Sequence, residues 1–298
     1  MKQSKNAIAL LITLMFVIVI TVAIGFGLKQ VNSSAEIIKE EKFIYQSRVL
    51  VEDVLNILRS SKDIKKIADS NSSEELYLFL SQVAFIPLEY KDLKIVLKIS
   101  SARAKFNPSM LESNNSLLMR HYLNKYGVNA QYIEVLADNF GGIKDDNSYN
   151  SRIFEENPSL FREYIATLAH LKVINEFYIK EYNENALLKI DFNSLFYFGA
   201  DKNTSIDLNY ASAEVWKLIL GVSTERAEEL LLGAGTYETK EDLDLSDEEA
   251  QNLELFKTDC FEPILLVEIE LNESKNYSTI SFEYDISTQK GSNFVFKI

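Results

Sequence analysis

The 298-residue sequence predicts an α+β fold, in which an N-terminal transmembrane helix continues into an amphipathic helix that packs on an antiparallel sheet. A large, mainly α-helical domain is predicted to be inserted into the sheet domain. Three observations support this prediction: residues 7–28 carry no charge, a single strand-like segment at 93–99 precedes a long stretch with helical periodicity, and strand-like segments return only after Pro263. Because a lone strand near residue 95 needs partners, an insertion explains this order better than two consecutive domains.

The first element is the uncharged run of residues 7–28, which contains no proline and is apolar at nearly every position. A bilayer core about 30 Å thick needs about 20 such residues in a helix, and a helix satisfies all backbone groups within the segment. Lys2 and Lys5 precede the run, so the N-terminus is expected on the cytoplasmic side of the inner membrane and the bulk of the chain on the outer side. A cleaved signal peptide is the alternative, but its apolar core would be only about 7–15 residues, and residues 27–30 offer no A-x-A-like site.

The next element is an amphipathic helix, because apolar residues recur at three- and four-residue steps from 31 to 58 with charged residues between them. No proline, and no glycine after Gly27, separates it from the membrane segment, so one continuous helix of roughly 50 residues is expected. Polar residues at 60–61 and 71–73 are expected to end it and to begin new segments. Residues 76–86 fit either a helix or a strand. Further helices are expected at 117–126, 130–140, 160–182, 211–220 and 224–232, and three more strands at 264–271, 277–286 and 293–298.

The composition argues against several classes of function. A net charge of −13 without any run of Lys and Arg disfavours binding to a phosphate backbone. Cys260 is the only cysteine, so no intramolecular disulfide can form, and a buried apolar role is expected for it. His121 and His170 are the only histidines, and no catalytic triad, zinc, Walker A or dinucleotide motif surrounds them. We therefore expect no enzymatic activity.

Four short stretches carry a resemblance to a known family. Residues 7–14 (AIALLITL) look like a leader junction, and residues 102–108 (ARAKFNP) are similar to an "ARFNLN" motif. Residues 136–139, followed by Asp145 and Asp146, are a weaker echo of a "LADWID" segment and its acidic loop. Residues 206–215 (IDLNYASAEV) match "INLNTASAEVL", with Gly-Val-Ser where "PGIS" follows. In this order and spacing, they make the chain resemble the K-type minor pseudopilin of the type II secretion system, the general secretion pathway protein K family.

The resemblance implies a domain layout. A leader peptide (1–7) precedes the transmembrane helix (8–28), and a discontinuous pilin-like domain (29–105 and 262–298) is interrupted by an inserted helical domain (106–261).

The resemblance also implies cleavage by a prepilin peptidase between Ala7 and Ile8. Family leaders usually have Gly where this chain has Ala7, and a cut after Asn6 is the alternative. Most pilins have Glu at mature position five, whereas this chain has Ile12 there, or Leu11 in the other register. A buried carboxylate in lipid is costly, so a subunit that has no neighbouring amine to neutralise is expected to lack it. The K-type subunit lacks this Glu, which implies a position at the filament tip.

The function implied by the resemblance is that of a non-enzymatic minor pseudopilin that supports protein export across the outer membrane. Its implied partners are the I-type and J-type minor pseudopilins, the prepilin peptidase and the inner-membrane secretion platform. Its implied location is the bacterial inner membrane, with a single span and the bulk in the periplasm. Two alternatives stay open: a pseudopilin of a competence or type IV pilus machine, and a membrane-anchored helix-hairpin-helix receptor for DNA uptake.

Residues 206–245 also follow the pattern of a helix-hairpin-helix unit. Asp207 or Asn209 is expected to cap the first helix, Gly221 to allow a tight turn, and Ser223 to cap the second helix. Such hairpins can bind phosphates through their backbone amides. The many acidic residues around this hairpin favour a structural role instead.

The acidic loop that begins at Asp138 is a candidate calcium site. Calcium prefers six to eight oxygen ligands, and Asp138, Asp145, Asp146 and Asn147 could supply four side chains. The resemblance implies calcium in this region, whereas the spacing is not that of an EF-hand. A solvated acidic loop is the alternative.

Overall fold

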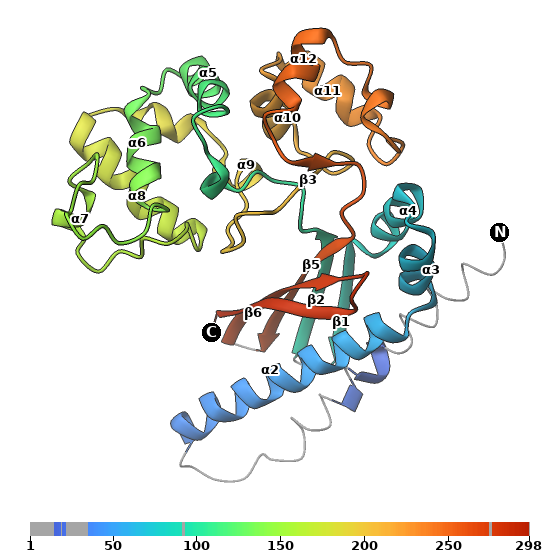
Figure 1. Cartoon of the computed structure of the whole chain (residues 1–298). Helices are drawn as coiled ribbons and strands as arrows, with labels where there is room; N and C mark the ends of the chain where they lie inside the picture. Colours follow the sequence, from blue (N-terminus) through green and yellow to red (C-terminus); the bar gives the residue numbers. More distant parts are fainter. Residues whose placement is uncertain (1–14, 19, 22–34, 91–92, 274–275, 298) are drawn as a thin grey trace. The chain divides into compact units, whose positions relative to one another are not determined.

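The computed structural model describes residues 15–18, 20–21, 35–90, 93–273 and 276–297, and the chain divides into two compact units (Figure 1). The sheet unit consists of Met1–Ala102 and Pro263–Ile298, and the helical unit of Arg103–Glu262. The chain enters the helical unit directly after a strand that ends at Ser101, and it leaves the unit just before a strand that begins at Ile264. The boundaries expected from the sequence, after residue 105 and before residue 262, lie within three residues of these divisions.

The sheet unit contains a five-stranded antiparallel sheet with the order β1-β2-β5-β6-β7. The strands are β1 (Phe85–Tyr90), β2 (Leu93–Ser101), β5 (Ile264–Glu273), β6 (Asn276–Asp285) and β7 (Lys290–Lys297). The prediction of helices combined with an antiparallel sheet is confirmed, and so are the strand at 93–99 and the three strands after Pro263. The ambiguous segment at 76–86 contains the end of a helix and the start of β1, because α4 (Ser73–Val83) stops just before this strand.

The central pairing of the sheet joins distant parts of the sequence. β2 pairs with β5 from Leu93↔Glu273 to Ser101↔Leu265, although the whole helical unit lies between them. Along β2, buried Ile95, Leu97 and Ile99 alternate with more exposed residues, as expected for a strand with one covered face. The same alternation in β5 buries Leu265, Val267, Ile269 and Leu271. One continuous apolar face therefore crosses the sheet.

Helix α2 (Ala35–Ser60) lies along one side of this sheet (Figure 1). Its described side chains form two adjacent apolar stripes, Leu50, Val54 and Ile57 in one and Val51, Leu55 and Leu58 in the other, and all six are buried. The predicted breaks are confirmed. Ser61 caps α3 (Lys62–Ser70) by accepting a hydrogen bond from Ile64 N, and Ser72 caps α4 in the same way.

Much of the N-terminal prediction falls outside the described residues. Of the predicted membrane segment 8–28, only residues 15–18 and 20–21 are described, and they are helical. The leader peptide, the cleavage site at Ala7 and Ile8, and Ile12 lie outside the described part, as does the expected junction between the membrane segment and α2. Within the residues that are described, no helix has the length and apolar character needed to cross a membrane.

The helical unit packs around one aromatic-rich core, in which Trp216, Tyr122, Tyr132, Phe106 and Phe196 are fully buried. It contains a short parallel pair, β3 (Ile206–Asp207) with β4 (Thr258–Asp259). Its helices are η1 (Pro108–Met110), α5 (Ser116–Tyr126), α6 (Gln131–Asp138), α7 (Ile153–Glu156), α8 (Leu168–Tyr182), η2 (Asn185–Lys189), α9 (Phe192–Leu195), α10 (Ala213–Leu220), α11 (Thr224–Leu232), η3 (Lys240–Leu243) and α12 (Asp247–Leu253).

The helix expected at 160–182 is correct only in its second part. α8 begins at Leu168, where Thr167 caps it by accepting a hydrogen bond from His170 N at 3.0 Å. The residues before it are held by long-range contacts. The Arg162 guanidinium lies 4.0 Å from the ring centroid of Phe154, and the carbonyl of Arg162 accepts a hydrogen bond from Gly142 N at 2.9 Å. These tertiary contacts override the local helical pattern.

Candidate functional site

The predicted helix-hairpin-helix unit is present as α10, a turn and α11. Gly221 has a φ of +73°, the left-handed conformation that favours glycine, and it ends α10. Ser223 caps α11 by accepting a hydrogen bond from Arg226 N at 3.3 Å, as predicted. The first cap was wrongly predicted. Ser212, rather than Asp207 or Asn209, accepts a hydrogen bond from Val215 N at the start of α10, because that helix begins later than its apolar pattern suggested.

Asp207 instead joins the two ends of the helical unit. Its backbone N–H donates to the carbonyl of Arg103 at 2.8 Å, where the chain enters the unit. Its carboxylate accepts a hydrogen bond from Glu262 N at 3.0 Å, where the chain leaves, and another from Asn209 N at 3.0 Å. The side chain is fully buried, and this burial raises the pKa of Asp207 to about 8. One residue of β3 thus fixes both connections to the sheet unit.

Asn209 organises the segment that follows α11. Its side-chain amide donates to the carbonyls of Tyr237 at 2.8 Å and Cys260 at 2.7 Å. Its side-chain oxygen accepts from Gly235 N at 2.8 Å and Tyr237 N at 3.1 Å. All four hydrogen bonds are buried. Cys260 is buried as predicted, and burial raises the pKa of its thiol to about 11, which disfavours the reactive thiolate.

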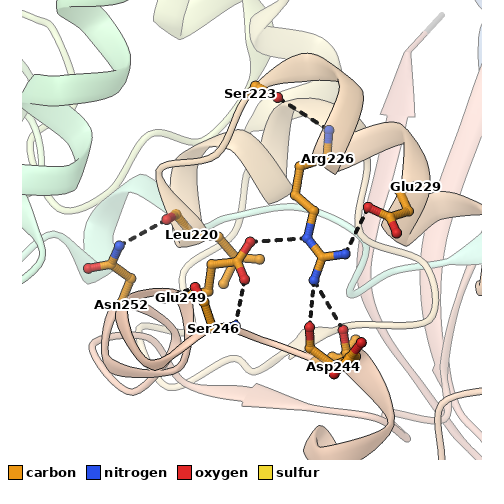
Figure 2. Close-up of polar contacts among 9 residues, drawn as sticks. Leu220, Ser223, Arg226, Glu229, Asp244, Ser246, Glu249 and Asn252 are labelled. Carbon is orange, nitrogen blue, oxygen red and sulfur yellow. Dashed lines mark hydrogen bonds and ion pairs between the residues drawn. The ribbon is translucent and has the colours of Figure 1, made fainter.

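Arg226 connects the hairpin to the chain around α12 (Figure 2). Its Nε donates to Glu249 Oε1 at 3.1 Å, its Nη1 to Glu229 Oε2 at 2.9 Å, and its Nη2 to the carbonyl of Asp244 at 2.8 Å. Glu249 is also part of a capping box with Ser246 at the start of α12. The guanidinium is therefore committed to contacts within the protein.

Two other basic residues near the hairpin, Lys125 and Lys217, are engaged in the same way. Lys125 Nζ donates to the carbonyls of Gly221 at 3.0 Å and Val222 at 2.9 Å, which are the carbonyls of the hairpin turn. Lys217 forms an ion pair with Glu214. Burial opposes the ionised form, but hydrogen bonds from Lys217, Tyr122 and Tyr126 lower the pKa of Glu214. This cluster joins α5 to α10, which are about 90 residues apart along the chain, so no local sequence pattern indicated it.

Charge is distributed unequally between the two units. Of the 31 Lys and Arg residues, 15 lie in residues 103–262, together with 28 of the 44 Asp and Glu residues. The helical unit therefore carries the whole net charge of −13. Residues 223–254, which include α11 and α12, contain eleven carboxylates and two basic residues. A surface of this charge repels a phosphate backbone, so the arrangement favours a structural role for the hairpin.

The structure gives Asp138 a different environment from the other predicted calcium ligands. Asp138 is buried at the end of α6, and its carboxylate accepts hydrogen bonds from Asn150 N at 2.9 Å and from Ser151 N and Oγ at 2.8 and 2.7 Å. Asp145, Asp146 and Asn147 are exposed. Hydrogen bonds from Ser148 lower the pKa of Asp146. Across the described residues, no three His, Cys, Asp or Glu side chains gather into a group that could hold a metal ion, and calcium binding stays a prediction.

The two histidines lie in different environments. His121 is exposed on α5. His170 is half-buried at the start of α8, where its Nδ1 accepts a hydrogen bond from Ala166 N at 3.3 Å and burial lowers the pKa of its imidazole.

Comparisons with known proteins bear on the fold. No family model matches the chain, and no curated protein matches it. A chain in the crystal structure of the GspK-GspI-GspJ complex from the type 2 secretion system of enterotoxigenic Escherichia coli is similar, with a TM-score of 0.55 and 11% sequence identity. The match covers 87% of this chain and 99% of that chain, so it extends over both units. The resemblance noted in the sequence is thus confirmed for the fold: the chain is folded like a component of a type II secretion complex of minor pseudopilins.

Proposed function

We propose that the protein is a non-enzymatic minor pseudopilin, that it lies at the tip of a type II secretion pseudopilus, and that it assembles there with I-type and J-type minor pseudopilins to support protein export across the outer membrane. The observation that carries this proposal is the continuous likeness of both units to a chain of a minor pseudopilin complex. The proposal includes an inner-membrane anchor at 8–28, processing between Ala7 and Ile8, contact with the secretion platform, and a periplasmic location for both units.

The way the helical unit is attached supports a position at the tip. Both connections leave the sheet at neighbouring points, where Ser101 pairs with Leu265. The same end of the sheet lies at the C-terminal end of α2, because Ile286 N donates to the carbonyl of Pro263 at 3.0 Å and Arg59 Nε donates to the carbonyl of Gln289 at 3.2 Å. Both connections to the helical unit therefore leave the sheet near the end of α2 that is farther along the chain from the proposed membrane anchor.

The size of the helical unit also supports a terminal position. The unit spans Arg103–Glu262, which is more than half of the chain. A subunit in the filament shaft must present equivalent surfaces to the subunits above and below it, since a repeated head-to-tail contact builds a filament. An insertion of this size would interrupt that repeat. A terminal subunit has no such restriction.

The test is assembly with partners. The full chain would be co-expressed with the I-type and J-type minor pseudopilins of the same genome and extracted in detergent. The extract would be analysed by size-exclusion chromatography and native mass spectrometry. We expect a discrete complex with one copy of each subunit. Open-ended homopolymers, or a monomer that ignores both partners, would refute the proposal.

A matched variant separates binding from capping. Replacing residues 103–262 by a short Gly-Ser linker is sterically reasonable, because Ala102 N and the carbonyl of Ile264 are only 2.8 Å apart. If the helical unit ends the filament, this variant should still bind both partners but should no longer limit the assembly to one copy of each. A variant complex that stays discrete would argue against capping by the helical unit.

A further inference from the structure

A groove in the sheet unit is lined only by apolar side chains. It lies between one stripe of α2 and the part of the sheet formed by β1, β2 and β5. We call it the stem groove, and its lining residues are Leu50, Val54, Ile57, Leu88, Ile95, Leu97 and Ile269. All seven are buried. Side chains of α2 and of the sheet face each other across the groove, and a further segment of the chain also lines it.

The covering residues are Met15 and Ile18, which line the same space. The gap that remains is about 10 Å³, at most the size needed to admit one water molecule. Met15 is 3% exposed, whereas its neighbours Phe16 and Val17 are 45% and 56% exposed. Met15 and Ile18 are three residues apart and share one face of a helix, so the segment buries one face in the groove and leaves large apolar side chains on the other.

The segment around Met15 and Ile18 cannot lie in the stem groove and span a membrane at the same time. Met15 and Ile18 belong to the uncharged run of residues 7–28, which has the length and composition of a transmembrane helix. If the chain formed one continuous helix from Met15 to Ile57, a rise of 1.5 Å per residue would separate these residues by about 60 Å. In the structure both line a single small gap. The segment therefore fills the groove or crosses the bilayer, and cannot do both.

We infer that the stem groove is a binding site for an uncharged apolar helix, that the chain's own N-terminal segment around Met15 and Ile18 occupies it outside the bilayer, and that membrane insertion empties it. The bound segment exposes the apolar side chains of Phe16 and Val17, and these are better accommodated in a bilayer than in water. The segment is therefore expected to occupy the groove only where lipid is absent. The open groove then presents its seven apolar side chains only in the anchored subunit. Contacts made through this face are thereby restricted to the membrane-inserted form. The inference rests on the groove and the predicted anchor, and a secretion role is not required for it.

The test compares the accessibility of two cysteines on neighbouring stripes of α2. Val54→Cys lies in the groove, and Val51→Cys is a matched control of the same residue type on the adjacent buried stripe. Both would be made in a Cys260→Ser background, because Cys260 is the only native cysteine. The full chain would be synthesised in a cell-free system with and without phospholipid vesicles, and labelled with a maleimide. We expect Val54→Cys to be protected without vesicles and labelled with them, whereas Val51→Cys stays protected in both.

A second pair of variants identifies the occupant. Met15→Lys places a charge in the groove and should expose Val54→Cys to labelling even without vesicles, whereas Phe16→Lys, on the outward face, should leave it protected. Equal protection of Val54→Cys with and without vesicles would overturn the inference, and so would parallel labelling of Val51→Cys. Protection without vesicles that is lost on dilution would also overturn it, since the occupant would then be a second copy of the chain.

Discussion

Replacing Asn209 should destabilise the helical unit far more than replacing an amide side chain that makes only one hydrogen bond. The Asn209→Ala substitution removes four buried hydrogen bonds. They join the Asn209 side chain to the carbonyls of Tyr237 and Cys260 and to the N–H groups of Gly235 and Tyr237. A hydrogen bond within a protein contributes about 1 kcal/mol net, and a buried donor or acceptor left without a partner costs about 1–3 kcal/mol. Water that enters the space can satisfy some of the four groups left without a partner. The free energy of unfolding of the helical unit should therefore fall by about 4 kcal/mol.

The chain offers a probe that reports on this unit alone. Its single tryptophan, Trp216, is fully buried in the helical unit, so fluorescence follows the unfolding of that unit. A small domain has a urea m-value of about 2 kcal/mol per molar, so the loss should lower the unfolding midpoint by about 2 M without changing the slope. Residues 35–298 would be used, so that the apolar N-terminal segment does not interfere.

Asn252→Ala is the matched control, because the side chain of Asn252 makes a single hydrogen bond, to the carbonyl of Leu220 at 2.9 Å. Its midpoint should fall by only about 0.5 M, as expected for a loss of about 1 kcal/mol. If the two variants have equal midpoints, or if Asn209→Ala is the more stable of them, the buried network does not have the role assigned to it.

Four further predictions concern pH, metal, nucleic acid and processing. The folded pKa of Asp207 is raised to about 8, so its contribution to stability is fully present below about pH 4 and is lost as the pH rises towards 8. Asp207→Asn should remove this downward slope in the Trp216-monitored free energy of unfolding, and an unchanged slope would contradict the assignment. Millimolar calcium should raise the melting temperature of residues 35–298, and the Asp145→Ala/Asp146→Ala variant should lose that increase. No calcium-induced shift in the wild type would mean that the loop is merely solvated. Residues 35–298 should show no salt-sensitive mobility shift with duplex or single-stranded DNA, whereas binding that weakens steeply with salt would favour the DNA-uptake receptor. N-terminal sequencing of the membrane-purified protein should begin at Ile8, or at Ala7 in the other register, and an intact Met1 or a cut beyond Leu28 would contradict prepilin processing.

The sequence was most informative where the structure is set by local periodicity. β2 was predictable because apolar Ile95, Leu97 and Ile99 alternate with polar or less buried neighbours on a strand whose one face is covered. The turn at Gly221 and the cap at Ser223 were predictable because each depends on the conformation of one or a few residues. The predicted order of helix, strand, helical block and strands followed from such local signals.

The errors arose where distant residues decide the structure. The contacts of Asn209 reach 26 to 51 residues along the chain, so its role in fixing the Tyr237 segment has no local signal. Two polar residues, at 207 and 209, alternate with buried Ile206 and Leu208, and this pattern could have suggested a buried polar pair rather than a helix cap. Arg162 likewise keeps its segment out of α8 through contacts with Phe154 and Gly142.

The position of Asp207 has a consequence for how the chain matures during synthesis. β2 and β5 must pair although 162 residues separate Ser101 from Ile264, and closing a flexible loop of that length costs about 4 kcal/mol more than closing a two-residue turn. Once the helical unit has folded, Asp207 holds its entry at Arg103 and its exit at Glu262 through hydrogen bonds of 2.8 and 3.0 Å, so the ends of β2 and β5 are kept close together. At a translation rate of about 5–20 residues per second, the β1–β2 hairpin waits for about 8–30 s before β5 is available. Chaperone binding to the nascent chain should therefore be strongest in that interval, and slower translation of the insertion should lengthen it.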